Sequence, residues 1–290
     1  MLSRATCKLF FYAGFAVLLF SLAICASWMQ DNARLRAHAR AVTHGETRPT
    51  EIIVALTHWV YGTRGFAKNP HYYLLKPLGP TPMQIMKAGG DCADKSRLLS
   101  AMLNELGFSS GLVMISPCSN CPPIHTVVEA AYGGGRMVVD PVWDVDYRSI
   151  SGLYYGVREL AGTSLGRERI ASLKSQRGPT AKIRLMPDSE ATFDFAVGIN
   201  WNKNFVTRTV ASLLHIAGID TATVMRPRIM EDPKMAVFSF LLFLSLGGFT
   251  SGLLSAVFFR RQRLADQLES VTPHRFCSTT VHDLPRGRER

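Results

Sequence analysis

Residues 89–96 read Gly-Gly-Asp-Cys-Ala-Asp-Lys-Ser, and they open a run whose apolar side chains recur with helical spacing. The run extends to Leu106, and Gly107 follows as a C-terminal stop. We therefore expect Cys92 in the first turn of a helix, where free backbone N–H groups and the helix dipole favour an anion. Since the thiolate is the reactive form of cysteine, this position suits a nucleophile.

Two further motifs follow Cys92 in the chain. The sequence predicts three short strands, over 112–115, 126–130 and 136–139. His125, in His-Thr-Val-Val-Glu, lies at the start of the second strand, and Asp140, in Val-Val-Asp-Pro, lies at the end of the third. Three glycines at 133–135 supply a hairpin turn between them, so antiparallel pairing would bring His125 and Asp140 side by side. A histidine oriented by a carboxylate can remove the proton of a thiol. The order Cys, His, Asp is therefore what a thiol nucleophile needs.

Together the three motifs resemble the transglutaminase-like branch of the papain-like thiol enzymes, over roughly residues 50–145. The resemblance implies an α+β fold in which a nucleophile helix packs on an antiparallel sheet. It also implies Cys92 as nucleophile, His125 as base and acid, and Asp140 as the group that orients His125. The chemistry implied is attack on an amide or ester carbonyl to form a thioester, which an amine or water then resolves.

The oxyanion hole is the part of the family pattern that the sequence does not identify. The backbone N–H of Cys92 can supply one donor. Gln84, Trp59 and His58 are the candidates for a second donor. The strand after the histidine also departs from the pattern, because Thr126-Val127 stands where many members carry an aromatic residue.

A pair of cysteines, Cys118 and Cys121, precedes His125. A disulfide in an oxidising compartment is the expected state, with free thiols as the next alternative. A redox pair is disfavoured because the neighbouring prolines indicate an irregular loop. A zinc site made of these two cysteines with Cys92 and His125 has tolerable spacing, but it would occupy the nucleophile and leave the Asp-Pro motif unexplained. We therefore expect no metal and no cofactor.

Two stretches, residues 9–29 and 235–259, contain no charged side chain. Both reach the about 20 residues that an α-helix needs to cross a bilayer, so we expect two transmembrane helices. A cleaved signal peptide, or a lipoprotein-type site ending at Cys25, is the alternative for the first stretch. The apolar run there is longer than the roughly 7–15 residues of a signal core, which favours an anchor.

Arginines at 260, 261 and 263 follow the second stretch directly, which predicts a cytoplasmic basic tail over 260–290. Two crossings return residues 1–8 to the same side. Residues 30–234, with their core at about 50–145, are then expected to form a periplasmic or otherwise extracytoplasmic domain.

Outside the core the periodicity is less informative. It predicts helices over 34–42, 51–61 with Thr50 as N-cap, 147–175 and 205–216, a loop over 62–81, an exposed connection over 179–188, and a strand over 193–201.

The net charge of +11 is spread along the chain, and no basic block is interleaved with aromatic residues. This argues against nucleic-acid binding and for attraction to anionic membrane lipids or an acidic envelope polymer. Gly248 and Gly252 form a Gly-x-x-x-Gly pair that is compatible with association between copies.

The sequence therefore predicts a membrane-anchored, transglutaminase-like thiol acyltransferase or amide hydrolase that acts on a protein or peptide of the cell envelope. An envelope cysteine peptidase is the alternative enzyme. A catalytically inactive transglutaminase-like interaction module is the alternative without chemistry.

Overall fold

The computed structural model describes residues 4–63, 65–118, 121–202, 205–221 and 224–271. Most of the predicted basic tail, with Cys277, and the first three residues lie outside the described residues. The chain divides into two compact units. One consists of Met1–Phe20 with Leu241–Arg290, and the other of Ser21–Phe240.

The larger unit contains an antiparallel sheet of five strands in the order β4-β3-β2-β1-β5. The strands are β1 (Ser110–Ile115), β2 (His125–Tyr132), β3 (Gly135–Asp140), β4 (Val145–Asp146) and β5 (Ala196–Val197). Positive φ angles of 38° and 101° at Gly133 and Gly134 form the tight turn between β2 and β3, a conformation that glycine adopts at little cost. The α+β class and the three central strands are as predicted, whereas the strand expected over 193–201 is only two residues long.

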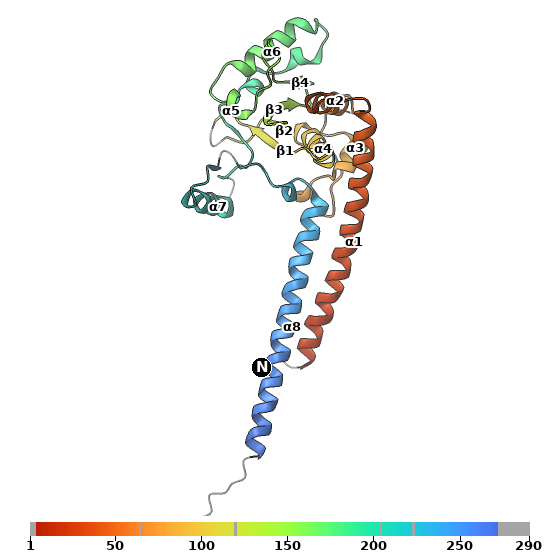
Figure 1. Ribbon diagram of the computed structural model, residues 1–290, viewed down its shortest axis with the longest axis vertical. Helices are drawn as coiled ribbons and strands as arrows, with labels where there is room; N and C mark the ends of the chain where they lie inside the picture. Colours follow the sequence, from red (N-terminus) through yellow and green to blue (C-terminus); the bar gives the residue numbers. More distant parts are fainter. Residues whose placement is uncertain (1–3, 64, 119–120, 203–204, 222–223, 272–290) are drawn as a thin grey trace, which may run out of the picture. The chain divides into compact units, whose positions relative to one another are not determined.

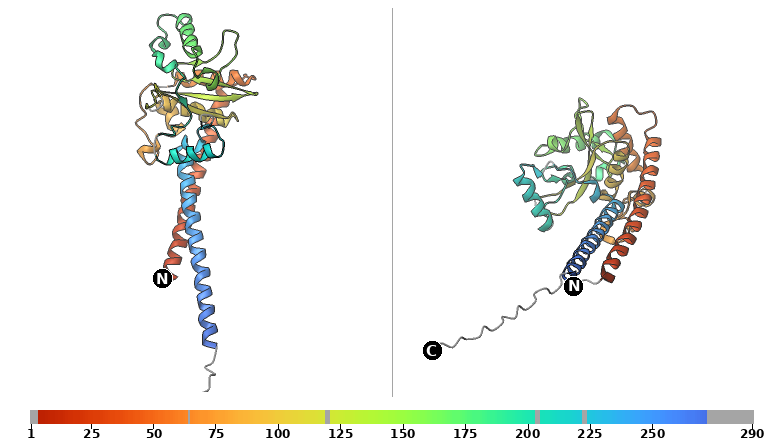
Figure 2. Two further views of the ribbon diagram at one scale, coloured as in Figure 1. Left: turned by 90° about the vertical axis from the view of Figure 1, so that its left-hand side faces the viewer. Right: turned by 60° about the horizontal axis from the view of Figure 1, so that its bottom comes forward.

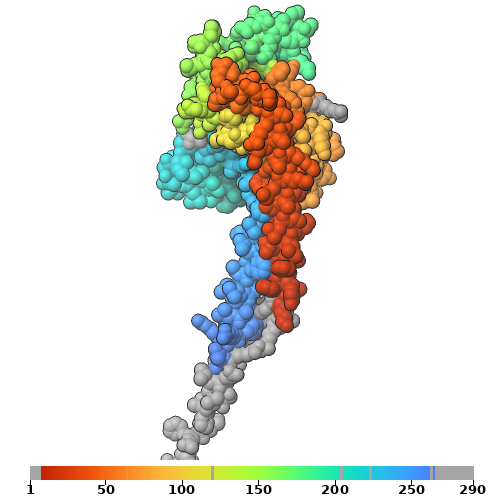
Figure 3. Space-filling view, turned by 45° about the vertical axis from the view of Figure 1, so that its right-hand side comes forward, coloured from red at the N-terminus to blue at the C-terminus, as the bar shows by residue number. Residues whose placement is uncertain are grey.

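Helix α4 (Cys92–Glu105) packs on one face of the sheet, mainly against β2. Around it lie α2 (Pro49–Gly62), α3 (Pro82–Ala88) and the end of α1 (Arg4–Val42). Leu98, Leu99 and Met102 of α4 are fully buried in this layer. Each such side chain contributes about 1.5–3 kcal/mol by burial. In the space-filling view the N-terminal helices, coloured red to orange, lie beside and over α4, so that only part of it is visible (Figure 3).

The other face of the sheet is covered by α5 (Val157–Leu160), α6 (Leu165–Gln176) and two short 3-10 helices, η2 (Lys182–Leu185) and η3 (Asp188–Ala191). Tyr147 and Phe193 meet edge to face there, with ring centroids 5.0 Å apart. The sheet thus lies between two helical layers, as the ribbon diagram shows (Figure 1) and the turned views of it also show (Figure 2).

Three predictions for flanking elements are wrong. Residues 147–156 do not form a helix but fold back through an antiparallel bridge between Arg148 and Tyr154, with Gly152 at a positive φ of 87°. The connection over 179–188 is not exposed throughout, because Ile183 lies in the core. Helix α2 begins at Pro49, so its N-cap is Arg48 rather than Thr50.

Other elements were missed or refined. The region 62–81, predicted as a loop, contains a 3-10 helix, η1 (Lys76–Leu78). Helix α3 begins at Pro82, directly after this region. The helix expected over 34–42 is the C-terminal part of α1. Helix α7 (Phe205–Ile216) has its predicted bounds and buries none of its residues, and the short η5 (Arg228–Met230) precedes α8 (Pro233–Val271).

Two helical segments, Lys8–Val42 and Pro233–Arg261, are long and apolar enough to cross a membrane. In the most apolar stretch of each segment only 17% and 11% of the residues are buried, whereas the core helix of a soluble domain is mostly buried. In the smaller unit, a Cβ atom on Gly248 would lie 3.2 Å from the Cα of Gly14. Gly248 is therefore used in packing within the chain, and association between copies through Gly248 and Gly252 stays a prediction.

Candidate active site

Cys92 is the first residue of α4 and carries a free, half-buried thiol. Asp91 caps the helix, since its side chain accepts a hydrogen bond from the N–H of Asp94 at 3.1 Å. The remaining N–H groups of the first turn, that of Cys92 included, have no partner within the helix. The local sequence thus places the sulfur at the positive end of a helix dipole.

One close approach fixes the start of α4, and one hydrogen bond joins this helix to the sheet. Gly90 has no room for a side chain, because an added Cβ would lie 2.2 Å from the Cβ of Asp94. The hydroxyl of Ser96 donates a hydrogen bond of 2.8 Å to the carbonyl oxygen of Thr126, the residue after His125. Helix α4 and the start of β2 are therefore held together next to Cys92 and His125.

His125 begins β2, and Asp140 ends β3. Nε2 of His125 lies 2.7 Å from Oδ2 of Asp140, and both side chains are buried. The other oxygen of Asp140, Oδ1, accepts hydrogen bonds from the N–H groups of Val142 at 2.8 Å and Trp143 at 3.3 Å. The turn after the Asp-Pro motif therefore fixes the carboxylate, and the carboxylate fixes the imidazole.

Cys92 also lies close enough to His125 to contribute to the rise in the pKa of that imidazole. Because Asp140 occupies Nε2, Nδ1 is the nitrogen left for the sulfur. The structure thus brings together the three residues that the motifs predicted, in the order sulfur, imidazole, carboxylate. Their catalytic roles stay predictions.

A second carboxylate, that of Glu190 on η3, reaches the same imidazole. Its Oε2 lies 3.4 Å from Nδ1 of His125 and accepts a hydrogen bond of 2.7 Å from the indole N–H of Trp143. No pattern in the sequence indicates this contact. Glu190 follows Asp140 by fifty residues, belongs to no motif, and comes directly after a segment predicted to be an exposed connection.

The surroundings of His125 act on its pKa in two directions. Burial lowers the pKa, but the charge of Asp140 and its hydrogen bond, the proximity of Cys92 and the charge of Glu190 outweigh burial. The pKa of His125 is raised from 6.5 to about 10. At neutral pH the imidazole therefore favours its protonated form, which is the form that accompanies a thiolate and can donate a proton to a leaving group.

Each of the three candidates for the second oxyanion donor makes a contact outside the Cys92, His125 and Asp140 group. Oε1 of Gln84 accepts a hydrogen bond from the N–H of Thr81 in the capping box of α3. Nδ1 of His58 lies 3.1 Å from Asp144. Trp59 packs edge to face on His38, with ring centroids 4.5 Å apart. The role of these three residues in an oxyanion hole stays a prediction.

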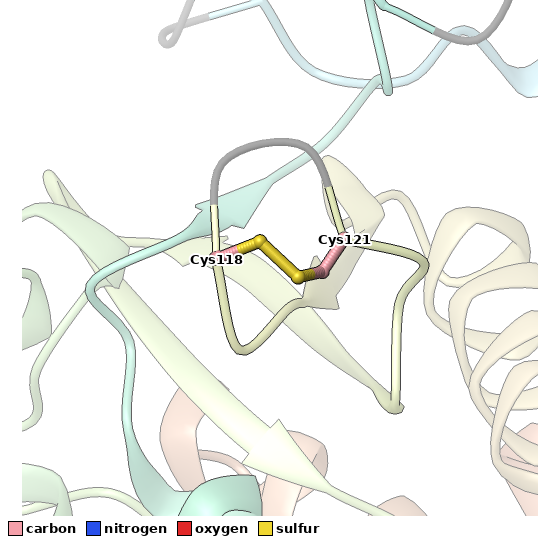
Figure 4. Close-up of a disulfide and its surroundings, with 2 residues drawn as sticks. All are labelled: Cys118 and Cys121. Carbon is pink, nitrogen blue, oxygen red and sulfur yellow. A yellow bond between two sulfur atoms is a disulfide. The ribbon is translucent and has the colours of Figure 1, made fainter.

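Cys118 and Cys121 form a disulfide across the loop before β2, with their Cα atoms 5.1 Å apart (Figure 4). Sulfurs in a disulfide are not available as thiolate ligands, which disfavours the Cys₃His zinc alternative. Among the described residues, no group of three or more His, Cys, Asp or Glu side chains is suited to hold a metal ion.

The fold and the site together define an α+β domain with a Cys-His-Asp constellation. No protein-family model and no curated protein matches the chain. One solved structure, of a proposed cysteine protease from Cytophaga hutchinsonii, is similar over 42% of this chain and 40% of its own length, with 18% identity and a TM-score of 0.33. The chain thus spans less than half of that protein, and a similarity this low assigns neither fold nor activity. The chemistry has to be argued from the side chains themselves.

Proposed function

We propose that this protein is a membrane-anchored thiol enzyme of the transglutaminase-like type, which forms a thioester between Cys92 and an acyl group of an envelope protein or peptide. One observation carries the proposal. A single buried imidazole is hydrogen-bonded to the Asp140 carboxylate and lies close to Cys92, the first residue of α4. That arrangement holds the proton of the thiol and returns it to a leaving group.

The steps follow from the positions of the groups. In the reactive pair the proton of Cys92 resides on Nδ1 of His125, in keeping with the raised pKa of that imidazole, and the thiolate attacks the carbonyl carbon of an amide or ester. Donors at the start of α4 stabilise the oxyanion that forms. The C–N or C–O bond then breaks, and the amine or alcohol leaves with the proton from His125. Water or an amine attacks the thioester, gives its proton to the now neutral imidazole, and releases Cys92 as a thiolate.

The surroundings of the domain support an extracytoplasmic location. Two helices of the chain are long and apolar enough to span a membrane, and the arginines after the second one favour a cytoplasmic C-terminus. The Cys118–Cys121 disulfide is typical of an oxidising compartment. The domain between the spans would then face an envelope substrate.

The proposal is tested by the rate at which iodoacetamide alkylates Cys92 in the detergent-solubilised full chain at pH 5.5–6.0. We expect fast alkylation in the wild type and a loss of about 100-fold or more in His125→Ala, because the imidazole no longer holds the proton. His44→Ala is the matched control, since that histidine is exposed and has no part in the proposed site.

Equal and slow alkylation in all three proteins would contradict the proposal and favour the catalytically inactive interaction module. If Cys92 reacts as expected, candidate envelope peptides then separate the two outcomes of the thioester. Incorporation of a labelled amine identifies an acyltransferase. New peptide termini identify a hydrolase or peptidase.

A further inference from the structure

Glu190 places a second carboxylate at His125, at the nitrogen that does not face Asp140. Its Oε2 is held by the Trp143 indole at 2.7 Å and lies 3.4 Å from Nδ1 of His125. Its Oε1 makes no hydrogen bond with any described residue and is not among the buried polar atoms. The side chain is 19% exposed, whereas that of Asp140 is fully buried.

Orientation of the imidazole does not require this second carboxylate. Asp140 already holds Nε2 at 2.7 Å and is itself fixed by two backbone N–H groups. The contact with Glu190 is longer and is made at Nδ1, the nitrogen that the proposed function assigns to the Cys92 proton. Glu190 is therefore placed to touch substrate, while Asp140 is not.

The charges around the imidazole indicate what kind of substrate group would be attracted. Two carboxylates flank one imidazolium, and formation of the Cys92 thiolate adds a third negative charge. A positively charged group beside Oε1 of Glu190 would offset the excess, and a negatively charged group there would be repelled.

We propose, on the basis of the function above, that Glu190 with Trp143 forms a subsite for a cationic group, a primary ammonium or a guanidinium, on the acyl part of the substrate next to the carbonyl that Cys92 attacks. Trp143 holds the carboxylate in place through its N–H, and Oε1 receives the cation. Glu190 is then a specificity-determining residue.

The test uses three methanethiosulfonate reagents that share an ethyl linker and differ in the charge of the group they transfer: trimethylammonium-ethyl, hydroxyethyl and sulfonato-ethyl. In each reaction the Cys92 thiolate attacks the thiosulfonate sulfur, an S–S bond to the transferred group forms, and methanesulfinate leaves. The transferred group occupies the position of the acyl substituent. Rates are measured in the full chain by mass spectrometry of the peptide that contains Cys92, so reaction at other cysteines is not counted.

In the wild type we expect the cationic reagent to be favoured over the neutral one, and Glu190→Gln to lower this rate ratio about tenfold, as for unit charges a few ångströms apart in a partly exposed site. The sulfonate should gain in the same variant. Because each ratio compares reagents on one protein, a general loss of reactivity cancels. Glu190→Asp, which keeps the charge, should retain most of the preference.

Asp188→Asn is the matched control on the same 3-10 helix, since Asp188 is 85% exposed and faces Lys174. This variant should leave the ratio unchanged. An equal ratio in wild type and Glu190→Gln, with Cys92 still fast and dependent on His125, would overturn the subsite and leave the proposed function intact. Slow reaction of all three reagents that His125→Ala does not alter would overturn the thiol chemistry, and the subsite with it.

Discussion

At the scale of the residue, Asp140 controls the protonation of His125. The pKa of His125 in the fold, about 10, lies above its ordinary value of 6.5. Protonation of this side chain therefore contributes stability that is fully present below pH 6.5 and is lost as the pH rises through 10. Asp140→Asn removes the charge but keeps an oxygen for the N–H of Val142. We expect the free energy of unfolding of the wild type to fall more steeply between pH 7 and pH 10 than that of the variant.

Urea unfolding at several pH values measures this difference, and NMR titration should show the pKa of His125 moving back toward 6.5 in Asp140→Asn. Identical pH slopes in the two proteins would contradict the coupling between the two side chains.

The residues of the site differ in how far the sequence could predict them. His125 and Asp140 stand at the ends of neighbouring strands, so periodicity and turn signals are enough to predict that they lie side by side, whereas the placement of Cys92 next to them was implied by the resemblance to the transglutaminase-like enzymes. Glu190 has no such signal. Its position depends on how η2 and η3 fold back over the sheet, and no local pattern encodes that path.

At the scale of the element, the first turn of α4 depends on the lack of a side chain at residue 90. In Gly90→Ala the new Cβ would meet the Cβ of Asp94 at 2.2 Å, and because that atom lies next to the backbone, the turn that carries Cys92 must shift. We expect a loss of about 1–3 kcal/mol in stability, as for other overpacked sites. Alkylation of Cys92 should also become slower.

Gly62→Ala is the matched control, because a Cβ there meets nothing within 4 Å. It should leave both the unfolding midpoint and the alkylation rate close to those of the wild type. Unchanged alkylation in Gly90→Ala would show that the site tolerates a displaced turn.

Elements whose apolar residues follow one regular spacing could be predicted from the sequence. The short helices that cover the sheet on the face opposite α4 could not. Helix α4 and strands β1 to β3 have clear apolar spacing, and their predicted ends agree with the structure within two residues. Residues 147–156 instead fold back around a bridge between Arg148 and Tyr154, and their apolar side chains follow no regular period, with Ile150 and Leu153 both exposed. Tyr147 is buried there because of its contact with Phe193, which lies 46 residues away and cannot be inferred from local spacing.

At the scale of the whole molecule, charged side chains connect helix α4 to the residues before α8. Arg97 of α4 lies 3.2 Å from Asp94 and 3.9 Å from Glu231, and Glu231 lies 2.8 Å from Arg226. Burial raises the pKa of Glu231, and the two arginines oppose that shift. The Arg97–Glu231 pair joins residues that are more than 100 positions apart, so the sequence alone did not indicate it.

The orientation of the whole chain in a membrane follows from the arginines after its second apolar helix, which are expected to stay in the cytoplasm. The chain offers a probe for each side: Asp188→Cys at an exposed position of the domain, and the native Cys277 of the tail. The test uses a Cys92→Ser background and a membrane-impermeant maleimide, applied to intact cells whose outer barrier, where they have one, is permeabilised. The maleimide should label Asp188→Cys at once and should label Cys277 only after the membrane is opened. The opposite pattern would show that the domain is cytoplasmic, where reducing conditions would also disfavour the Cys118–Cys121 disulfide. Equal labelling of both positions before and after opening would contradict a spanning arrangement altogether.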